Sequence, residues 1–88
     1  MELKEQFDAA QLKVKTLTER PANDELLDLY ALFKQATDGD NNTEEPGMFD
    51  IKEKFKWAQW GKKQGMSGEE AMKAYVALVD AMLGKYSH

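Results

Sequence analysis

The chain has 88 residues, enough for one hydrophobic core but not for two. It contains no cysteine, which excludes disulfides, thiolate nucleophiles and cysteine-based metal sites. Sixteen acidic residues against twelve basic ones give a net charge of -4, which argues against a surface that wraps nucleic acid but permits a local patch that binds phosphate.

The first residues show no sign of export or membrane insertion. Residues 1–7 alternate charged side chains with isolated apolar ones and lack the apolar run of a signal peptide. No stretch of the chain reaches the length of a transmembrane helix. We therefore expect one domain over residues 1–88 and a cytoplasmic location.

Apolar residues near the start of the chain recur at alternating steps of four and three. This spacing places them in one narrow stripe and predicts a helix over residues 3–18. Pro21 then interrupts the pattern, and Asn23 is expected to be the N-cap of the next helix. The stripe consists of Leu3, Phe7, Ala10, Val14 and Leu17.

The second expected helix has an unusually wide apolar surface. Its apolar residues spread over roughly 220° of the helix circumference, about twice what a surface helix needs. Two explanations stay open: the helix is the buried centre of the domain, or part of its apolar surface is reserved for a partner that is not protein. These residues are Leu26, Leu27, Leu29, Tyr30, Leu32, Phe33 and Ala36.

A long polar connection follows, over residues 38–49, and it is rich in turn-forming residues. A connection of this length can cross from one end of a helical bundle to the other, which would make the two flanking helices parallel. Its spaced acidic residues suggest calcium, but an EF-hand loop requires glycine where Thr43 stands and glutamate where Phe49 stands. We therefore predict no metal site.

The third expected helix begins with a capping-box pattern formed by Asp50 and Glu53. It runs to about Lys63 and closes near Gly65. Lysines 52, 56 and 63 fall within one narrow arc of this helix, beside an apolar row that contains Ile51 and Phe55. A cationic rim is thus expected to border an apolar surface.

A second capping-box pattern, Ser67 with Glu70, begins the fourth helix, whose apolar period continues to Gly84. The sequence contains no strand pattern and no internal repeat. The expected fold is all-α, a four-helix bundle with a long crossover loop between the second and third helices.

Catalytic explanations find little support. His88 is the only histidine and the last residue, a poor position for a general base or a metal ligand. Ser67 is better explained as an N-cap than as a nucleophile, since no base lies near it in sequence. We expect no catalytic residue, and the chain is predicted not to be an enzyme.

Aromatic and cationic residues share faces on two helices. Tyr30, Phe33 and Lys34 lie at i, i+3 and i+4, and Lys56 follows Phe55. Lysines are ordinarily solvated surface residues, but their position beside rings favours a ligand with a phosphate end, an aromatic base and an apolar tail.

The remaining aromatic residues of the last two helices fit structural roles. Trp57 and Trp60 lie on the far side of the third helix from Ile51 and are assigned to packing. Tyr75 lies among apolar neighbours in mid-helix, where it could be a buried ring or a ligand contact.

In this order and context, the residues resemble the acyl-CoA-binding protein family. The resemblance extends from Phe7 to Tyr86, nearly the whole chain. It is carried by Tyr30, Phe33, Lys34, Gln35, Ala36, Thr37, Gly39, Asp40, Asn42, Pro46, Gly47, Met48, Lys54, Lys56, Trp57, Trp60, Ala71, Met72, Lys73, Ala74 and Tyr75.

The resemblance implies an up-down-down-up bundle that binds, buffers and transports medium- and long-chain acyl-CoA esters noncovalently, without a cofactor. Matched by position, the residues that hold the CoA head would be Lys15, Tyr30, Lys34 and Lys56 at the phosphates, Phe33 stacked on adenine, and Tyr75 near the ligand. The acyl groove would be lined by Ala10, Leu26 and Leu27. Many relatives carry tyrosine where Phe33 stands, so that stacking is kept while a hydroxyl hydrogen bond is lost.

We further expect a monomer that makes transient contacts with membranes and with enzymes that produce or consume acyl-CoA, and the net charge of -4 predicts that it does not bind nucleic acid. One alternative stays open, a helical protein-interaction module whose apolar groove docks a partner helix. The lysines separate the two, because helix docking does not require cations beside stacked rings.

Overall fold

The computed structural model describes residues 2–86 and confirms the all-α prediction. The described residues form four α-helices and one short 3-10 helix, with no strand among them. In chain order the elements are α1 (Leu3–Lys13), η1 (Val14–Thr16), α2 (Asn23–Asp38), α3 (Ile51–Gly61) and α4 (Gly68–Tyr86).

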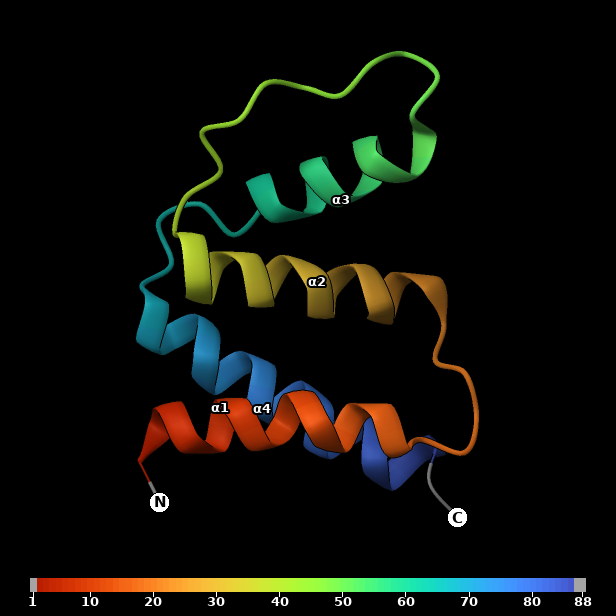
Figure 1. Ribbon diagram of the computed structural model, residues 1–88, viewed down its shortest axis with the longest axis vertical. Coiled ribbons are helices and arrows are strands. Elements are labelled where there is room, and N and C mark those ends of the chain that lie inside the picture. Colours follow the sequence, from red (N-terminus) through yellow and green to blue (C-terminus); the bar gives the residue numbers. More distant parts are fainter. Residues whose placement is uncertain (1, 87–88) are drawn as a thin grey trace.

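The helices follow the expected up-down-down-up order. Figure 1 shows α1 and α4 running in one direction and α2 and α3 in the opposite one. The loop of residues 39–50 runs back alongside α3 to the end at which α2 began, so that α2 and α3 lie side by side and parallel (Figure 1). The long polar connection is therefore the crossover that its length predicted.

The hydrophobic core lies where α4 packs against α1 and α2. Within residues 2–86, α2 is the only helix that packs against α3. One side of α3 is thus left without a helical neighbour, and the α2–α3 pair stands apart from the main core. The buried core residues are Phe7, Ala10, Leu29, Leu32, Tyr75, Val79 and Met82.

The first helix is shorter than predicted. Its α-helical part ends at Lys13, and the chain continues as the 3-10 helix η1 to Thr16 rather than as α-helix to residue 18. The Thr16 hydroxyl donates to the Lys13 carbonyl at 2.7 Å, a local bond that competes with the α-helical pattern and accompanies a tighter last turn.

The predicted cap of α2 is wrong by one residue. Ala22 occupies the N-cap position, and Asn23 is already the first helical residue. The side-chain Oδ1 of Asn23 accepts from Arg20 at 3.3 Å, while the Ala22 N–H donates to the Glu25 carboxylate at 3.2 Å. The Glu25 side chain, in the first turn of α2, therefore accepts the hydrogen bond of the N-cap backbone N–H.

The two other predicted caps differ in outcome. Asp50 is the N-cap of α3, but its side chain makes no capping hydrogen bond in the described structure. At α4 the predicted capping box is present, since the Glu70 N–H donates to Ser67 Oγ at 3.1 Å and the Ser67 N–H to Glu70 Oε1 at 3.3 Å. The C-terminal ends of both helices differ from the prediction. Helix α3 ends at Gly61 rather than near Lys63, and α4 continues past Gly84 to Tyr86.

Trp57 and Trp60 hold the first part of the long loop against α3. The indole N–H of Trp60 donates to the Gly39 carbonyl at 2.8 Å, and that of Trp57 to the Thr43 carbonyl at 2.9 Å. The Asn41 amide returns a bond to the Trp57 carbonyl at 3.0 Å. Both tryptophans thus have structural contacts with the loop, and both also line a small hollow beside Tyr30 and Lys34.

Asp40 ties together the end of α2 and the turn before α4. Its Oδ1 accepts from the Gly65 N–H and from Gln35 Nε2, each at 2.8 Å, and Gln35 also donates to the Met66 carbonyl at 2.9 Å. Gly65 suits this turn because its φ of +89° lies in the left-handed region. These hydrogen bonds, that of Gly65 above all, lower the pKa of the Asp40 carboxyl.

We expect this contribution of Asp40 to stability to depend on pH. A carboxyl whose pKa is lowered by folding stabilises the fold above its ordinary value of 3.8, and the contribution is lost as the pH falls through the lower folded value. Urea unfolding of the wild type and Asp40→Asn should therefore differ at pH 7 and converge toward pH 2. A difference that is constant with pH would contradict this assignment.

Candidate ligand-binding site

The wide apolar surface of α2 is divided between two neighbours. Leu29 and Leu32 are buried in the core, with 8% and 3% of their surface exposed. Leu26, Leu27 and Tyr30 are half-buried and face the side of α3. The first explanation holds for the side of the helix that is core, whereas the other side lines a cavity, so that the second explanation, a partner that is not protein, stays a prediction.

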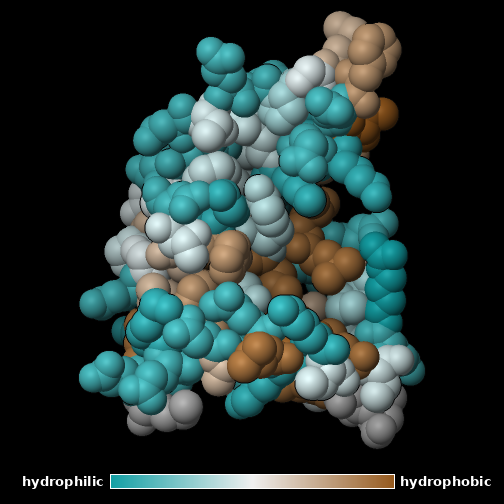
Figure 2. All heavy atoms as spheres, viewed as in Figure 1, coloured by the Kyte–Doolittle hydropathy of each residue, from teal (hydrophilic) through white to brown (hydrophobic). Residues whose placement is uncertain are grey.

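The α2–α3 cleft is the cavity on this second side, with a volume of about 540 Å³. This size is ordinary for a small-molecule site. Figure 2 shows it as a hollow with hydrophobic walls between the levels of α3 and α2. Its walls are Leu26, Leu27 and Tyr30 from α2, and Ile51, Lys52, Phe55 and Lys56 from α3, with Arg20 and Asn23 at the start of α2.

Cationic groups lie above aromatic rings at the cleft and beside it. Lys56 Nζ stands 5.2 Å from the centre of the Tyr30 ring, and Lys34 Nζ stands 5.0 Å from that of Trp60. Lys34 also pairs with Asp38, and the hydrogen bond to Asp38 raises the pKa of the lysine. Lys34 is therefore positively charged at neutral pH.

A smaller hollow of about 250 Å³ adjoins the cleft on the other side of Tyr30. Tyr30 lines both spaces, so that the two lie next to each other. Lys34 stands in the wall of the smaller hollow and Lys56 in the wall of the larger. Together they can place two positive charges around one elongated ligand.

Three of the expected site residues lie on the other side of α2. The ring of Phe33 is 6.0 Å from that of Phe7 and 6.5 Å from that of Tyr75. Tyr75 and Ala10 are 4% and 3% exposed, and burial raises the pKa of the Tyr75 hydroxyl. None of the three lines the α2–α3 cleft.

The expected residues are thus gathered in two places. Tyr30, Lys56, Leu26 and Leu27 line the α2–α3 cleft, and Lys34 lies in the adjoining hollow. Lys15 is exposed on η1, apart from the cleft.

Further residues of the cleft are absent from the expected set. Ile51, Lys52 and Phe55 belong to the cationic rim and apolar row predicted on the third helix, so the sequence contained their signal. Arg20 and Asn23 were missed as lining residues. The only local signal was a cation just before the predicted helix start. Lys63, also in the predicted rim, instead pairs with Asp28 at 2.6 Å.

Residues 2–86 contain no group of three or more side chains suited to holding a metal ion. His88, which we did not expect to be a base or ligand, lies outside the described residues. No helix within the same range is long and apolar enough to cross a membrane.

Known proteins resemble this chain over most of its length. The sequence model of the family described as "Acyl CoA binding protein" matches residues 4–79. The "Acyl-CoA-binding protein homolog 1" of Caenorhabditis elegans is 59% identical over 91% of this chain and 93% of its own length. The Drosophila melanogaster homolog is 53% identical over 94% and 96%.

Solved structures agree with these sequence matches. The crystal structure of Oryza sativa Acyl-CoA-Binding Protein 2 superposes with a TM-score of 0.91 at 40% identity, over 96% of this chain and 93% of that one. The crystal structure from Moniliophthora perniciosa gives 0.88 at 38% identity, over 100% and 86%.

Proposed function

This chain belongs to the acyl-CoA-binding protein family, and we propose that the α2–α3 cleft is where it receives the acyl-CoA ester. The chain binds, buffers and transports medium- and long-chain acyl-CoA esters. One observation carries the assignment of the site: an apolar cleft with Lys56 over the ring of Tyr30 in its wall, next to a smaller hollow in which Lys34 stands over Trp60.

The CoA head has several negative charges, and the lysines at the border are its proposed partners. Lys56, Lys34 and the Tyr30 hydroxyl bind phosphate oxygens. Lys15 adds charge from η1. Since these groups are at least partly exposed, salt weakens their interaction with the ligand.

The acyl chain occupies the apolar part of the cleft. Leu26 and Leu27 form one wall, and Phe55 forms the opposite one. Burial of each methylene group contributes about 0.8 kcal/mol when it is fully removed from water. Affinity therefore rises with chain length until the cleft is full.

The adenine base lies across α2 from the acyl chain, on the partly buried ring of Phe33. Tyr75 packs near that ring. Ala10, expected in the acyl groove, is buried in the same core, and its proposed role is to leave room for the ligand as a small side chain. A ligand with its head on this side and its tail in the cleft spans α2. In this proposal both groups of expected residues belong to one site.

The proposed role is that of a carrier rather than of an enzyme. The family is one of ligand-binding proteins, and we propose that this chain performs no chemistry and needs no cofactor. It acts as a single-domain monomer in the cytoplasm, receiving esters from membranes and from enzymes that make them and delivering them to enzymes that use them.

Calorimetric titration with palmitoyl-CoA tests this proposal. We expect one-to-one binding that tightens from octanoyl to palmitoyl esters, whereas CoA alone and free palmitate each bind at least about tenfold more weakly, since each lacks one end of the ligand. Equal affinity for free palmitate and its ester would contradict a two-ended site. No binding of any ester would direct attention to helical peptides as occupants of the cleft.

A further inference from the structure

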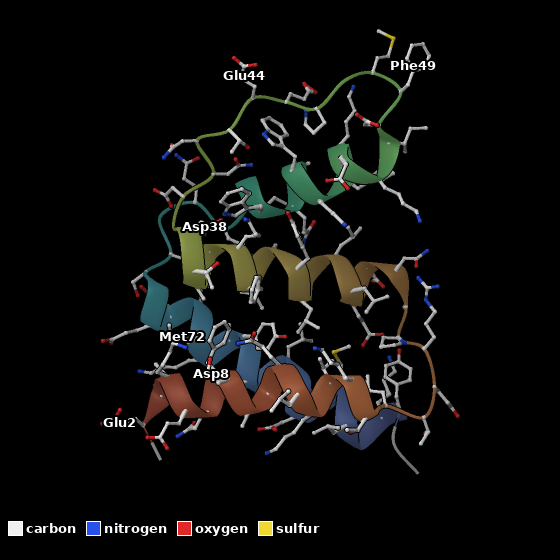
Figure 3. The ribbon with its side chains drawn as sticks, viewed as in Figure 1. Glu2, Asp8, Asp38, Glu44, Phe49 and Met72 are labelled. Atoms are coloured by element: carbon white, nitrogen blue, oxygen red, sulfur yellow. The ribbon has the colours of Figure 1, made fainter. Side chains whose placement is uncertain are left out.

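The turn that precedes α3 exposes two large apolar side chains. Phe49 is 93% exposed and Met48 is 76% exposed. Figure 3 shows Phe49 at the outer edge of the molecule, pointing away from the helices. In Figure 2 hydrophobic colour gathers at the same corner. We call Met48 and Phe49 the apolar tip.

The fold does not use the apolar tip for packing. The Asp50 N–H donates to the Gly47 carbonyl at 3.0 Å, which closes a tight turn with Met48 and Phe49 at its two central positions. Such positions usually carry glycine, proline, asparagine or aspartate. Two large apolar side chains at these positions lower solubility and do not stabilise the fold by burial. Their exposure therefore indicates a binding surface for another molecule.

The apolar tip continues into the α2–α3 cleft. Ile51 and Phe55 follow it on one face of α3, and they are 62% and 59% exposed. Both also line the cleft. An apolar surface therefore runs from the tip, along α3, to the place where the acyl chain is proposed to lie.

We propose that Met48 and Phe49 insert into the interfacial region of a phospholipid bilayer and bring the mouth of the α2–α3 cleft against the membrane. This inference rests on the proposed function, because it names the source from which that site is loaded. The acyl tail then passes from the bilayer to the cleft along Ile51 and Phe55, without crossing water.

The charges around the apolar tip favour a bilayer of zwitterionic lipid. Residues 44–56 carry four acidic side chains and three lysines, so that the region has almost no net charge. Glu45 lies 3.8 Å from Lys54, and Glu53 lies 3.6 Å from Lys56. Lys52 is exposed and forms no ion pair with a described residue, which leaves it free for a lipid phosphate.

The test compares the double variant Met48→Ser, Phe49→Ser with the control Leu12→Ser. Leu12 is 67% exposed on α1, a helix that lies at the opposite end of the molecule from the loop of residues 39–50 (Figure 1), so the control removes an exposed apolar group elsewhere. The measurements are co-sedimentation with phosphatidylcholine vesicles and the rate of uptake of a fluorescent long-chain acyl-CoA from them. The affinity for the same ester in vesicle-free solution is measured in parallel.

We expect the double variant to lose vesicle binding by about tenfold or more, since burial of two such side chains is removed, while Leu12→Ser matches the wild type. Uptake by the wild type should accelerate as vesicle concentration rises, as direct contact requires, and uptake by the double variant should not. The affinity in solution should stay within about twofold for all three proteins, because the apolar tip does not line the cleft.

Three results would overturn the inference. The first is equal vesicle binding by the double variant and the wild type, or none by either. The second is binding that needs phosphatidylserine, which would make headgroup charge the cause. The third is a loss of affinity in solution with vesicle binding intact, which would make the apolar tip a cover for the ligand. Vesicle binding through the tip by a protein that binds no ester would refute the proposed function and leave the docking site standing.

Discussion

Lys56→Ala is expected to weaken the binding of palmitoyl-CoA by about 10- to 100-fold. A hydrogen bond to a charged group contributes about 1.5 to 3 kcal/mol, and each 1.4 kcal/mol is a factor of ten in affinity. Lys56 is the proposed phosphate partner that lines the cleft itself, 5.2 Å above the ring of Tyr30. Calorimetric titration at low salt gives the ratio of dissociation constants.

The fold should survive this change. The ion pair of Lys56 with Glu53 is long, at 3.6 Å, and exposed, so its loss costs at most about 1 kcal/mol of unfolding free energy. Lys4→Ala is the matched control, since Lys4 forms an exposed ion pair with Asp8 on α1 and does not line the cleft. Equal affinity of both variants for the ester would remove Lys56 from the site. Unfolding of the Lys56 variant would make the lysine structural.

Added salt gives a second readout of the same contact. The wild type should lose affinity as ionic strength rises, because exposed charges are screened. The Lys56 variant has one charge fewer near the ligand and should show a shallower dependence. A role of Lys56 in packing alone would leave the two salt dependences parallel.

The helices and their order were predictable because helical periodicity is a local property of the sequence. Four separate apolar periods, of which the stripe of Phe7 is the first, predicted four helices, and the length of the loop after Asp38 suggested that α2 and α3 are parallel. Cap positions were less predictable. The start of α2 depends on the extended backbone of Ala22 and on Glu25 reaching back to it, which the identity of Asn23 does not reveal.

The candidate site was predictable only in part, for a geometric reason. Periodicity showed that the apolar surface of α2 was too wide for one neighbour, but not which residues faced α3. Arg20 precedes the helix, and its place at the cleft follows from the path of the chain before α2. The exposure of Phe49 was not predictable from the sequence either, since a phenylalanine before a helix is ordinarily expected to pack against the core.

Phe7→Ala is expected to cost about 3 to 5 kcal/mol of unfolding free energy, the usual range for removing a buried phenylalanine. Phe7 is 1% exposed, and its ring meets Tyr75 of α4 edge-on at 5.0 Å and lies over Phe33 of α2 at 6.0 Å. It thus joins α1 to both other helices of the core. A domain of this size has only about 4 to 13 kcal/mol of stability in total, so the loss is severe.

Urea unfolding followed by circular dichroism measures this loss. Leu12→Ala is the control, because Leu12 lies on the same helix but is 67% exposed, and its change should stay within about 0.5 kcal/mol. Phe7→Leu should recover part of the stability by refilling the cavity. A cost below about 1 kcal/mol for Phe7→Ala would mean that the aromatic cluster collapses without penalty, contrary to a close-packed core.

Substitution of Phe7 is also expected to affect ligand binding, because Phe7 packs against Phe33. The Phe33 ring is supported on its inner side by Phe7, with an angle of 25° between the ring planes, so that a base stacked on its outer side depends on that support. Phe7→Leu keeps the core filled but removes the flat surface, and should lower affinity for palmitoyl-CoA several-fold by loosening Phe33. If so, Phe33→Ala should cost less affinity in the Phe7→Leu protein than in the wild type, since residues in contact are not additive. Additive losses would instead mean that the two rings act separately, with Phe7 holding the fold and Phe33 meeting the ligand unaided.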